Sequence, residues 1–239
     1  MAGVGSRRKN DELILSGAVK LNGHTVDALG VQVDPRKDTI TVNGKPVLLQ
    51  EKFVYIILNK PKDAITTMSD EKNRTTVMQY VKIRQRVFPV GRLDRNTTGV
   101  LLFTNDGDLA NALIHPKFEV EKMYRVTLDK PFENEDIAKL RKGIKLEDGP
   151  AKARAVETID GSKRKKVLLT IAEGKNREVR RIFEALGYDV KQLDRVSFAG
   201  LTPLGIPRGS WRFLTRQEVN YLREIGGLSH PKEHYAIPA

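Results

Sequence analysis

The pattern of apolar and polar positions changes at Phe53. Before it the chain is polar, with one helix that begins after Ser6, a good N-cap, and ends at Gly17. Asn-Gly pairs separate short apolar stretches in this part and mark turns between strands. The expected strands are 18–21, 31–33 and 39–42. This segment is too small to bury a large core.

The continuous apolar run Phe53–Leu58 predicts a buried strand and the start of a larger domain. Val179, Ile182, Phe183 and Leu186 have helical spacing, so they predict a helix that Gly187 ends. Two other helices are expected from Asp106 to before Pro116 and from the Thr215 capping box to Gly226. Further strands are expected at 100–103, 123–128, 166–171, 190–196 and 211–214.

These elements predict an α+β protein with three parts. A small N-terminal domain covers 1–48, and a larger domain with a mixed, mainly antiparallel sheet and flanking helices covers 51–226. Residues 227–239 are expected to form a flexible tail.

The charge balance narrows the class of partner. Among 239 residues, 42 Lys and Arg against 30 Asp and Glu leave a formal net charge of +12. Such an excess attracts polyanions, above all nucleic acid, although a merely basic soluble surface is an alternative. No apolar run approaches the roughly 18 residues of a membrane span. The absence of cysteine excludes disulfides and thiolate chemistry and favours a cytoplasmic location.

Cofactor motifs are missing from the sequence. It contains neither a P-loop nor a dinucleotide fingerprint after a strand. His230 and His234 belong to an HxxEH string of the kind found in zinc hydrolases. Pro231 conflicts with the rigid helix that such a site needs, so a disordered tail is favoured. We therefore expect neither a metal nor a cofactor.

Two segments are richer in polar groups than a structural role requires. In Gly91–Gly99, Asp94 lies between two arginines whose charges favour the ionised carboxylate, although it could simply satisfy backbone N–H groups of a turn. In Glu173–Arg181, Arg180 borders the apolar helix face and can pair with a carboxylate in a cleft, whereas Arg181 points away. A solvated basic face is the alternative here.

Tyr124 shares a strand face with Val126 and Leu128. It is therefore either a core aromatic or a stacking platform whose phenol can handle a proton.

From Ala2 to Leu222 the chain resembles the pseudouridine synthases of the RsuA/RluB type, in which a ribosomal-S-four-type RNA-binding domain precedes the catalytic domain. The resemblance implies that 1–48 binds RNA, through Ser6, Arg7, Arg8 and Lys9, and that 51–226 is catalytic. Family members carry a helix before the 2–8 motif, so we expect the small domain to lack its first helix. The matching motifs are 2–8, 59–61, 91–107, 122–124 and 173–181.

The resemblance also implies roles for single residues. Asp94 is the nucleophile, Arg180 pairs with it, and Tyr124 stacks on the uracil. Leu193 closes the other face of the base, and Arg92 helps to extract the nucleotide from its stack. Lys175, Arg177 and Arg181 are expected to contact phosphates.

The implied reaction detaches a uracil of ribosomal RNA from its ribose, turns it, and rejoins it through ring carbon five. The pattern favours the large ribosomal subunit, needs no cofactor and implies no protein or membrane partner. A non-catalytic ribosome-assembly factor on the same fold is the alternative. The presence of Asp94, Tyr124 and Arg180 together favours catalysis, and a metal-dependent nuclease would need carboxylate clusters that the sequence lacks.

Overall fold

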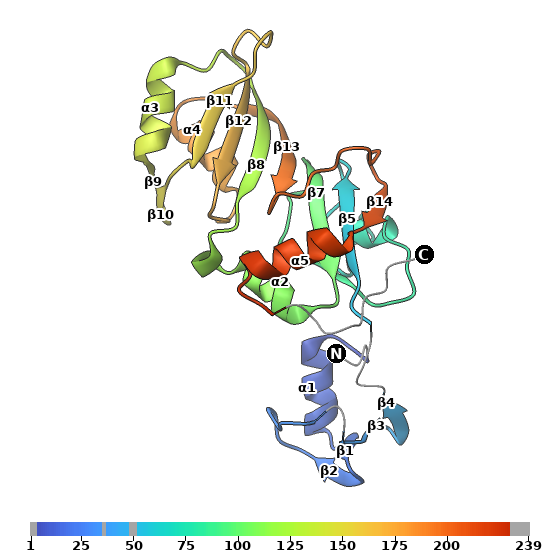
Figure 1. Cartoon of the computed structure of the whole chain (residues 1–239). Helices are drawn as coiled ribbons and strands as arrows, with labels where there is room; N and C mark the ends of the chain where they lie inside the picture. Colours follow the sequence, from blue (N-terminus) through green and yellow to red (C-terminus); the bar gives the residue numbers. More distant parts are fainter. Residues whose placement is uncertain (1–3, 35–36, 48–51, 230–239) are drawn as a thin grey trace. The chain divides into compact units, whose positions relative to one another are not determined.

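The computed structural model describes residues 4–34, 37–47 and 52–229. The chain divides into two compact units, of which the first ends at Phe53 and the second begins at Val54 (Figure 1). The His230–His234 string and most of the expected tail lie outside the described residues.

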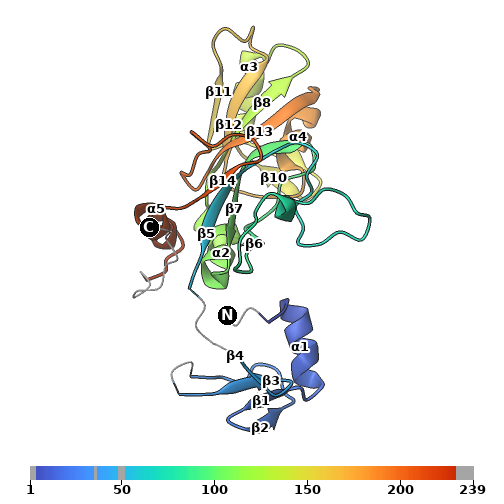
Figure 2. The ribbon, with the colours of Figure 1, turned by 90° about the vertical axis from the view of Figure 1, so that its right-hand side faces the viewer.

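The described residues of the small unit form one helix and a four-stranded antiparallel sheet (Figure 2). Helix α1 (Arg7–Leu15) begins as expected, because the Ser6 hydroxyl accepts a hydrogen bond from the Lys9 amide at 3.2 Å. None of the described residues 4–47 is fully buried. The sheet order is β2 (His24–Val26), β1 (Val19–Leu21), β3 (Ile40–Val42) and β4 (Lys45–Val47).

The prediction of a strand at 31–33 is wrong, because these residues lie outside any strand. The tight turn at Asn22 and Gly23, both with positive φ, returns the chain at once, so that Val26 pairs with Val19. His24–Val26 therefore takes the sheet position beside β1, and Val31 stays exposed outside any strand.

The larger unit is built on one mixed sheet in the order β11-β12-β8-β13-β7-β5-β14, with β6 paired to β7. The pairing of β13 with β7 is parallel, and the other pairs in this sheet are antiparallel, which confirms the expected fold class. The strands are β5 (Tyr55–Lys60), β6 (Phe88–Pro89), β7 (Thr97–Thr104), β8 (Lys122–Leu128), β11 (Ala155–Thr158), β12 (Lys166–Ile171), β13 (Val190–Phe198) and β14 (Trp211–Phe213). A separate hairpin joins β9 (Ile144–Leu146) to β10 (Gly149–Ala151).

Helices cover both halves of this sheet. Helix α4 (Glu178–Ala185) buries Val179, Ile182 and Phe183 in a core shared with β8 and β12, as their spacing predicted. Helix α2 (Gly107–Ile114) and helix α5 (Arg216–Ile225) lie together beside the other half (Figure 1). The sequence did not predict α3 (Asn134–Lys142), since its nine residues are mostly charged. Two short 3-10 turns span Val77–Gln79 and Pro116–Phe118.

Gly99 permits the close approach of the two parallel strands. A Cβ atom at this position would lie 2.1 Å from the Arg195 carbonyl oxygen of β13, and its φ is +109°. Any other residue would separate β7 from β13. This contact brings the loop before β7, which carries Asp94, against the middle of the sheet.

Candidate active site

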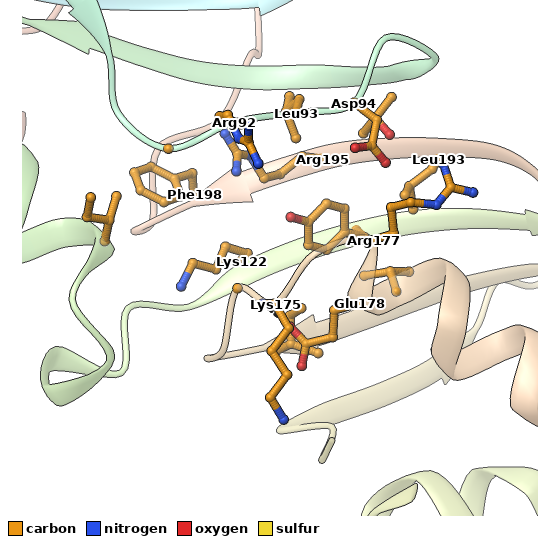
Figure 3. A pocket seen from close by; sticks show the side chains of 17 residues that line it. Arg92, Leu93, Asp94, Lys122, Lys175, Arg177, Glu178, Leu193, Arg195 and Phe198 are labelled. Atoms are coloured by element: carbon orange, nitrogen blue, oxygen red, sulfur yellow. Dashed lines mark hydrogen bonds between the residues drawn. The ribbon is translucent and has the colours of Figure 1, made fainter. Parts of the chain in front are cut away.

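A cavity of about 160 Å³ lies where the loop before β7, strands β8 and β13, and the N-terminal end of α4 converge (Figure 3). We call it the active cavity. Six residues singled out from the sequence line it: Arg92, Asp94, Tyr124, Lys175, Arg177 and Leu193. The structure adds Thr97, Lys122, Glu178, Arg195 and Phe198 to the lining.

The loop that carries Asp94 is held from beneath by Lys60. This side chain is fully buried, and its Nζ donates to the carbonyl oxygens of Thr97 at 2.8 Å, Asp94 at 3.1 Å and Arg95 at 3.2 Å. Burial lowers the pKa of Lys60 to about 8, and the nearby carboxylates of Asp94 and Asp63 oppose that shift. One buried ammonium group therefore holds three backbone carbonyl groups at and just after Asp94.

The same loop is tied at its other side. The Thr66 hydroxyl donates to the Leu93 carbonyl at 2.7 Å and accepts from the Leu93 amide at 3.2 Å. The Asp63 amide donates to the Arg95 carbonyl at 2.9 Å. Because its neighbours on both sides are held, Asp94 has a fixed position at the cavity wall.

Arg195 lines the active cavity next to the aromatic side chains of Tyr124 and Phe198. It is opposite Tyr124 in the β8–β13 register, and its Nε donates to the Val100 carbonyl at 2.8 Å. Burial lowers the pKa of Arg195, and its contact with the Tyr124 phenol opposes this effect. Its guanidinium stacks 4.8 Å from the Phe198 ring centroid, while one Nη nitrogen has no partner in the described structure. The buried guanidinium group of Arg195 therefore lies next to the Tyr124 hydroxyl.

Leu193 supplies an apolar wall. It is 6% exposed and pairs with Val126 of β8 on one side and with Thr97 of β7 on the other. It therefore comes from the neighbouring strand to Tyr124, and both side chains reach the active cavity. An aromatic ring and a branched aliphatic side chain on adjacent strands form a pair of surfaces suited to a flat base.

The α4 end of the cavity holds a buried carboxyl group. Glu178 accepts from the Lys175 amide at 3.0 Å through Oε2, whereas Oε1 has no partner among the described residues. Burial raises the pKa of Glu178. Lys122 donates to the Ala172 carbonyl at 2.8 Å, and burial together with the Arg195 charge lowers its pKa to about 8.

The structure keeps Arg180 and Arg181 out of the active cavity. Arg180 donates to the Val190 carbonyl at 3.0 Å, so the expected ion pair with Asp94 does not form within residues 52–229. The start of β13 lies beside this face of α4 and supplies the nearer acceptor. Arg181 forms a two-pronged pair with Asp148, with both N–O distances at 2.8 Å.

The expected RNA-contact residues of the small unit lie at the start of α1. Ser6 serves as the N-cap, and Arg7, Arg8 and Lys9 are exposed. Their role in binding RNA stays a prediction.

Sequence reasoning assigned no role to four charged residues that shape the site: Lys60, Lys122, Glu178 and Arg195. A signal was available for one of them. Lys60 ends the strand that the apolar run predicts, and a charged residue in such a position is buried only when its group is paired. Arg195 gave no such signal, because its strand contains several other polar residues.

The described part of the chain holds no group of three His, Asp or Glu side chains that could bind a metal ion. Within the same residues, no helix combines the length and hydropathy that crossing a bilayer requires.

Comparison with known proteins gives a consistent result. Residues 54–185 match the family model of RNA pseudouridylate synthases. The chain is 46% identical to the ribosomal large subunit pseudouridine synthase B of Bacillus subtilis, over 94% of this chain and 93% of that protein. It is 40% identical to the Yersinia pestis protein of the same name, over 94% of this chain and 73% of that protein.

A solved structure agrees with these matches. A crystal structure of a pseudouridylate synthase superimposes with a TM-score of 0.68 at 32% identity and covers 92% of this chain and 95% of that one. The chain therefore belongs to the RNA pseudouridylate synthase family.

Proposed function

We propose that this protein converts a uridine of large-subunit ribosomal RNA into pseudouridine, with Asp94 as the nucleophile. The observation that carries the proposal is the position of Asp94, held by the buried Lys60 at the wall of a small cavity that Tyr124 and Leu193 also line. The relatives named as large-subunit synthases support the choice of substrate. The substrate implies a cytoplasmic location.

In this mechanism the extruded uracil lies between Tyr124 and Leu193. Extruding a base costs a few kcal/mol, which contacts elsewhere on the RNA must supply. The Asp94 carboxylate attacks the anomeric carbon of the ribose, and the electron pair of the glycosidic bond leaves with ring nitrogen one. An alternative route, in which the same carboxylate assists removal of a sugar proton, makes the same demand on its ionisation and position.

The detached base turns inside the cavity, and its carbon five bonds to the anomeric carbon as Asp94 leaves. Nitrogen one takes up a proton, and carbon five loses the hydrogen it carried. The Tyr124 phenol, which contacts the buried Arg195 guanidinium, is the group that we assign to proton movement. Water must be kept from the detached base until the new bond forms.

We assign Arg180 to the Asp94 carboxylate in the RNA complex, where its side chain would turn from the Val190 carbonyl towards the active cavity. Its guanidinium uses one nitrogen on the Val190 carbonyl, so other N–H groups are free to pair with a carboxylate. Arg92 assists extrusion. Lys175, Arg177 and Arg181 contact phosphates, as do Arg7, Arg8 and Lys9 after the Ser6 cap.

Tritium release from ribosomal RNA labelled at carbon five of uridine tests this proposal. We expect release from the large-subunit transcript and none from the small-subunit transcript. Release from the small-subunit transcript alone would contradict the substrate assignment. Binding of both transcripts without release would indicate a non-catalytic RNA-binding protein.

A further inference from the structure

The central sheet presents different side chains on its two faces. Successive residues of a strand point to opposite faces, and the register aligns Tyr124 with Arg195 but Arg125 with Asp194. Tyr124 and Arg195 line the active cavity, whereas Arg125 and Asp194 line a second, larger hollow. The same alternation occurs in β7, where Thr97 belongs to the first and Thr98 to the second. The second hollow therefore opens mainly on the opposite face of the sheet, and it meets the active cavity at Leu193, which lines both.

This hollow has a volume of about 660 Å³ and a strongly basic lining. Six cationic side chains line it against a single carboxylate, that of Asp194. The cations are Lys62, Arg125, Lys166, Arg180, Lys191 and Arg208. Such a density of positive charge on one concave surface is suited to a polyanion.

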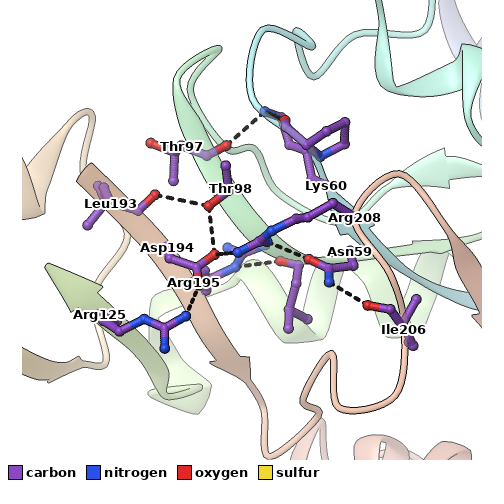
Figure 4. A network of polar contacts seen from close by, with 12 residues as sticks. Asn59, Lys60, Thr97, Thr98, Arg125, Leu193, Asp194, Arg195, Ile206 and Arg208 are labelled. Atoms are coloured by element: carbon purple, nitrogen blue, oxygen red, sulfur yellow. Dashed lines mark hydrogen bonds and ion pairs between the residues drawn. The ribbon is translucent and has the colours of Figure 1, made fainter. Parts of the chain in front are cut away.

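The single carboxylate is already paired with cations of the hollow (Figure 4). Asp194 accepts from Thr98 at 2.7 Å, from Arg125 at 2.7 Å and from Arg208 at 2.5 Å. Burial raises the pKa of Asp194, but these hydrogen bonds outweigh it and hold the pKa below its ordinary value. Asp194 therefore stays charged and fixes both arginines, which are about half exposed at 49% and 42%. Their remaining N–H groups face solvent with fixed geometry.

The two sites meet at the Asp94 loop. Asp94 and Thr97 line the active cavity, while Asn96 and Thr98 line the second hollow. Lys62, which follows the strand of the buried Lys60, is exposed on the same side as Asn96. An RNA strand that delivers a nucleotide to Asp94 would therefore pass over this loop to reach the second hollow.

We propose that the second hollow binds phosphate groups of the substrate RNA that flank the target uridine. This inference rests on the proposed function, because it assumes that the RNA is the molecule modified at Asp94. The hollow supplies affinity on the far side of the loop and thereby part of the free energy that base extrusion requires.

A triple variant tests the inference: Lys62→Ala, Lys166→Ala and Lys191→Ala together. These side chains are exposed, and the active cavity is not lined by any of them. The matched control replaces Lys72, Lys82 and Lys142, which are exposed and lie outside both sites. Both variants lose the same charge, so a difference between them reports position rather than net charge.

Fluorescence anisotropy gives the Kd of each protein at several salt concentrations. The RNAs are the large-subunit transcript and the shortest hairpin that the wild type still modifies. For the transcript, we expect the triple variant to lower the slope of log Kd against log salt by about 2 and to weaken binding about tenfold near 0.15 M salt. The control should show little change with either RNA, whereas the triple variant should lose affinity for both, because the hairpin also carries the phosphates next to the target uridine.

Equal slopes for the triple variant and its control on the transcript would overturn the inference. That result would indicate that the basic hollow binds an acidic protein segment and not the substrate RNA. Failure of the proposed function is a separate result, since the wild type would then release no tritium at all while its binding slopes could still be measured.

Discussion

Two segments around the active cavity differ in how their side chains are held. In Gly91–Gly99 the backbone is fixed from inside by Lys60, and the Asp94 carboxyl group faces the cavity. In Glu173–Arg181 the cations are paired with the Glu173 carboxylate of the same segment, with the Asp148 carboxylate and with backbone carbonyls. The Lys60 contacts of the first segment are buried and hold the backbone rigidly. The cations of the second segment have exposed partners that RNA phosphates can replace.

This difference shows where preorganisation is used. A reacting carboxylate must be within a fraction of an ångström of its target, so its loop is fixed before the substrate arrives. Cations that bind a flexible polyanion gain little from such rigidity, and surface ion pairs hold them at little cost.

The largest effect is expected for Arg180 in the exchangeable segment. Arg180→Ala should lower the single-turnover rate about 100-fold or more, because the Asp94 carboxylate loses a guanidinium partner in the RNA complex. Arg181→Ala is the matched control and should change the rate less than about threefold, since Arg181 is occupied by Asp148. Equal losses in both variants would mean that the helix face has been assigned wrongly.

The next effect concerns the rigid segment. Lys60→Met leaves several buried carbonyl groups without a donor, so we expect the free energy of unfolding to fall by about 2–4 kcal/mol. The single-turnover rate should fall about 100-fold as Asp94 moves. Thr66→Val, which loosens the same loop without removing a charge, should give a smaller loss in the same direction. A folded Lys60→Met protein with the wild-type rate would contradict the account.

The half-buried Lys122 should make the free energy of unfolding depend on pH. The pKa of Lys122 is lowered to about 8 from its ordinary value of 10.5. Between these values the unfolded chain binds more protons than the folded chain, so the free energy of unfolding rises with pH, and the gain is lost as pH falls through the folded pKa. Relative to Lys122→Met, the wild type should gain about 1–2 kcal/mol across this window in urea denaturation. A difference that stays constant with pH would exclude this burial effect.

The smallest effect is expected for the partner of Arg181. Asp148→Asn removes a half-exposed ion pair, so the free energy of unfolding should fall by about 0.5 kcal/mol in urea denaturation. The turnover rate should stay at the wild-type value. A large loss of turnover would show that Arg181 must be held in place, which contradicts the exchangeable character of its segment.

Periodicity and turn signals predicted most of the fold. Six strands and three helices of the larger unit were expected near their observed positions, because their apolar faces are continuous and well bounded. The charged helix α3 was not predicted, since Ile137 and Leu140 alone carry its apolar signal. The strand expected at 31–33 failed because the Asn22-Gly23 turn uses the sheet edge first.

The site was predictable where a side chain lies on a recognisable motif. Asp94, Tyr124 and Leu193 do line one cavity. The contacts that hold them were not predictable, because the fixing group, Lys60, is 34 residues away from Asp94 in sequence. Arg195 illustrates the same limit, since its partner strand is set by the close approach at Gly99.

The most direct measurement compares Asp94→Asn with the wild type on the large-subunit transcript, by tritium release and by RNA affinity. The substitution preserves the size of the side chain and removes the nucleophilic carboxylate. We predict an unchanged Kd, within about twofold, and no tritium release. Measurable turnover by the folded Asp94→Asn protein would contradict the assignment of Asp94 as the nucleophile.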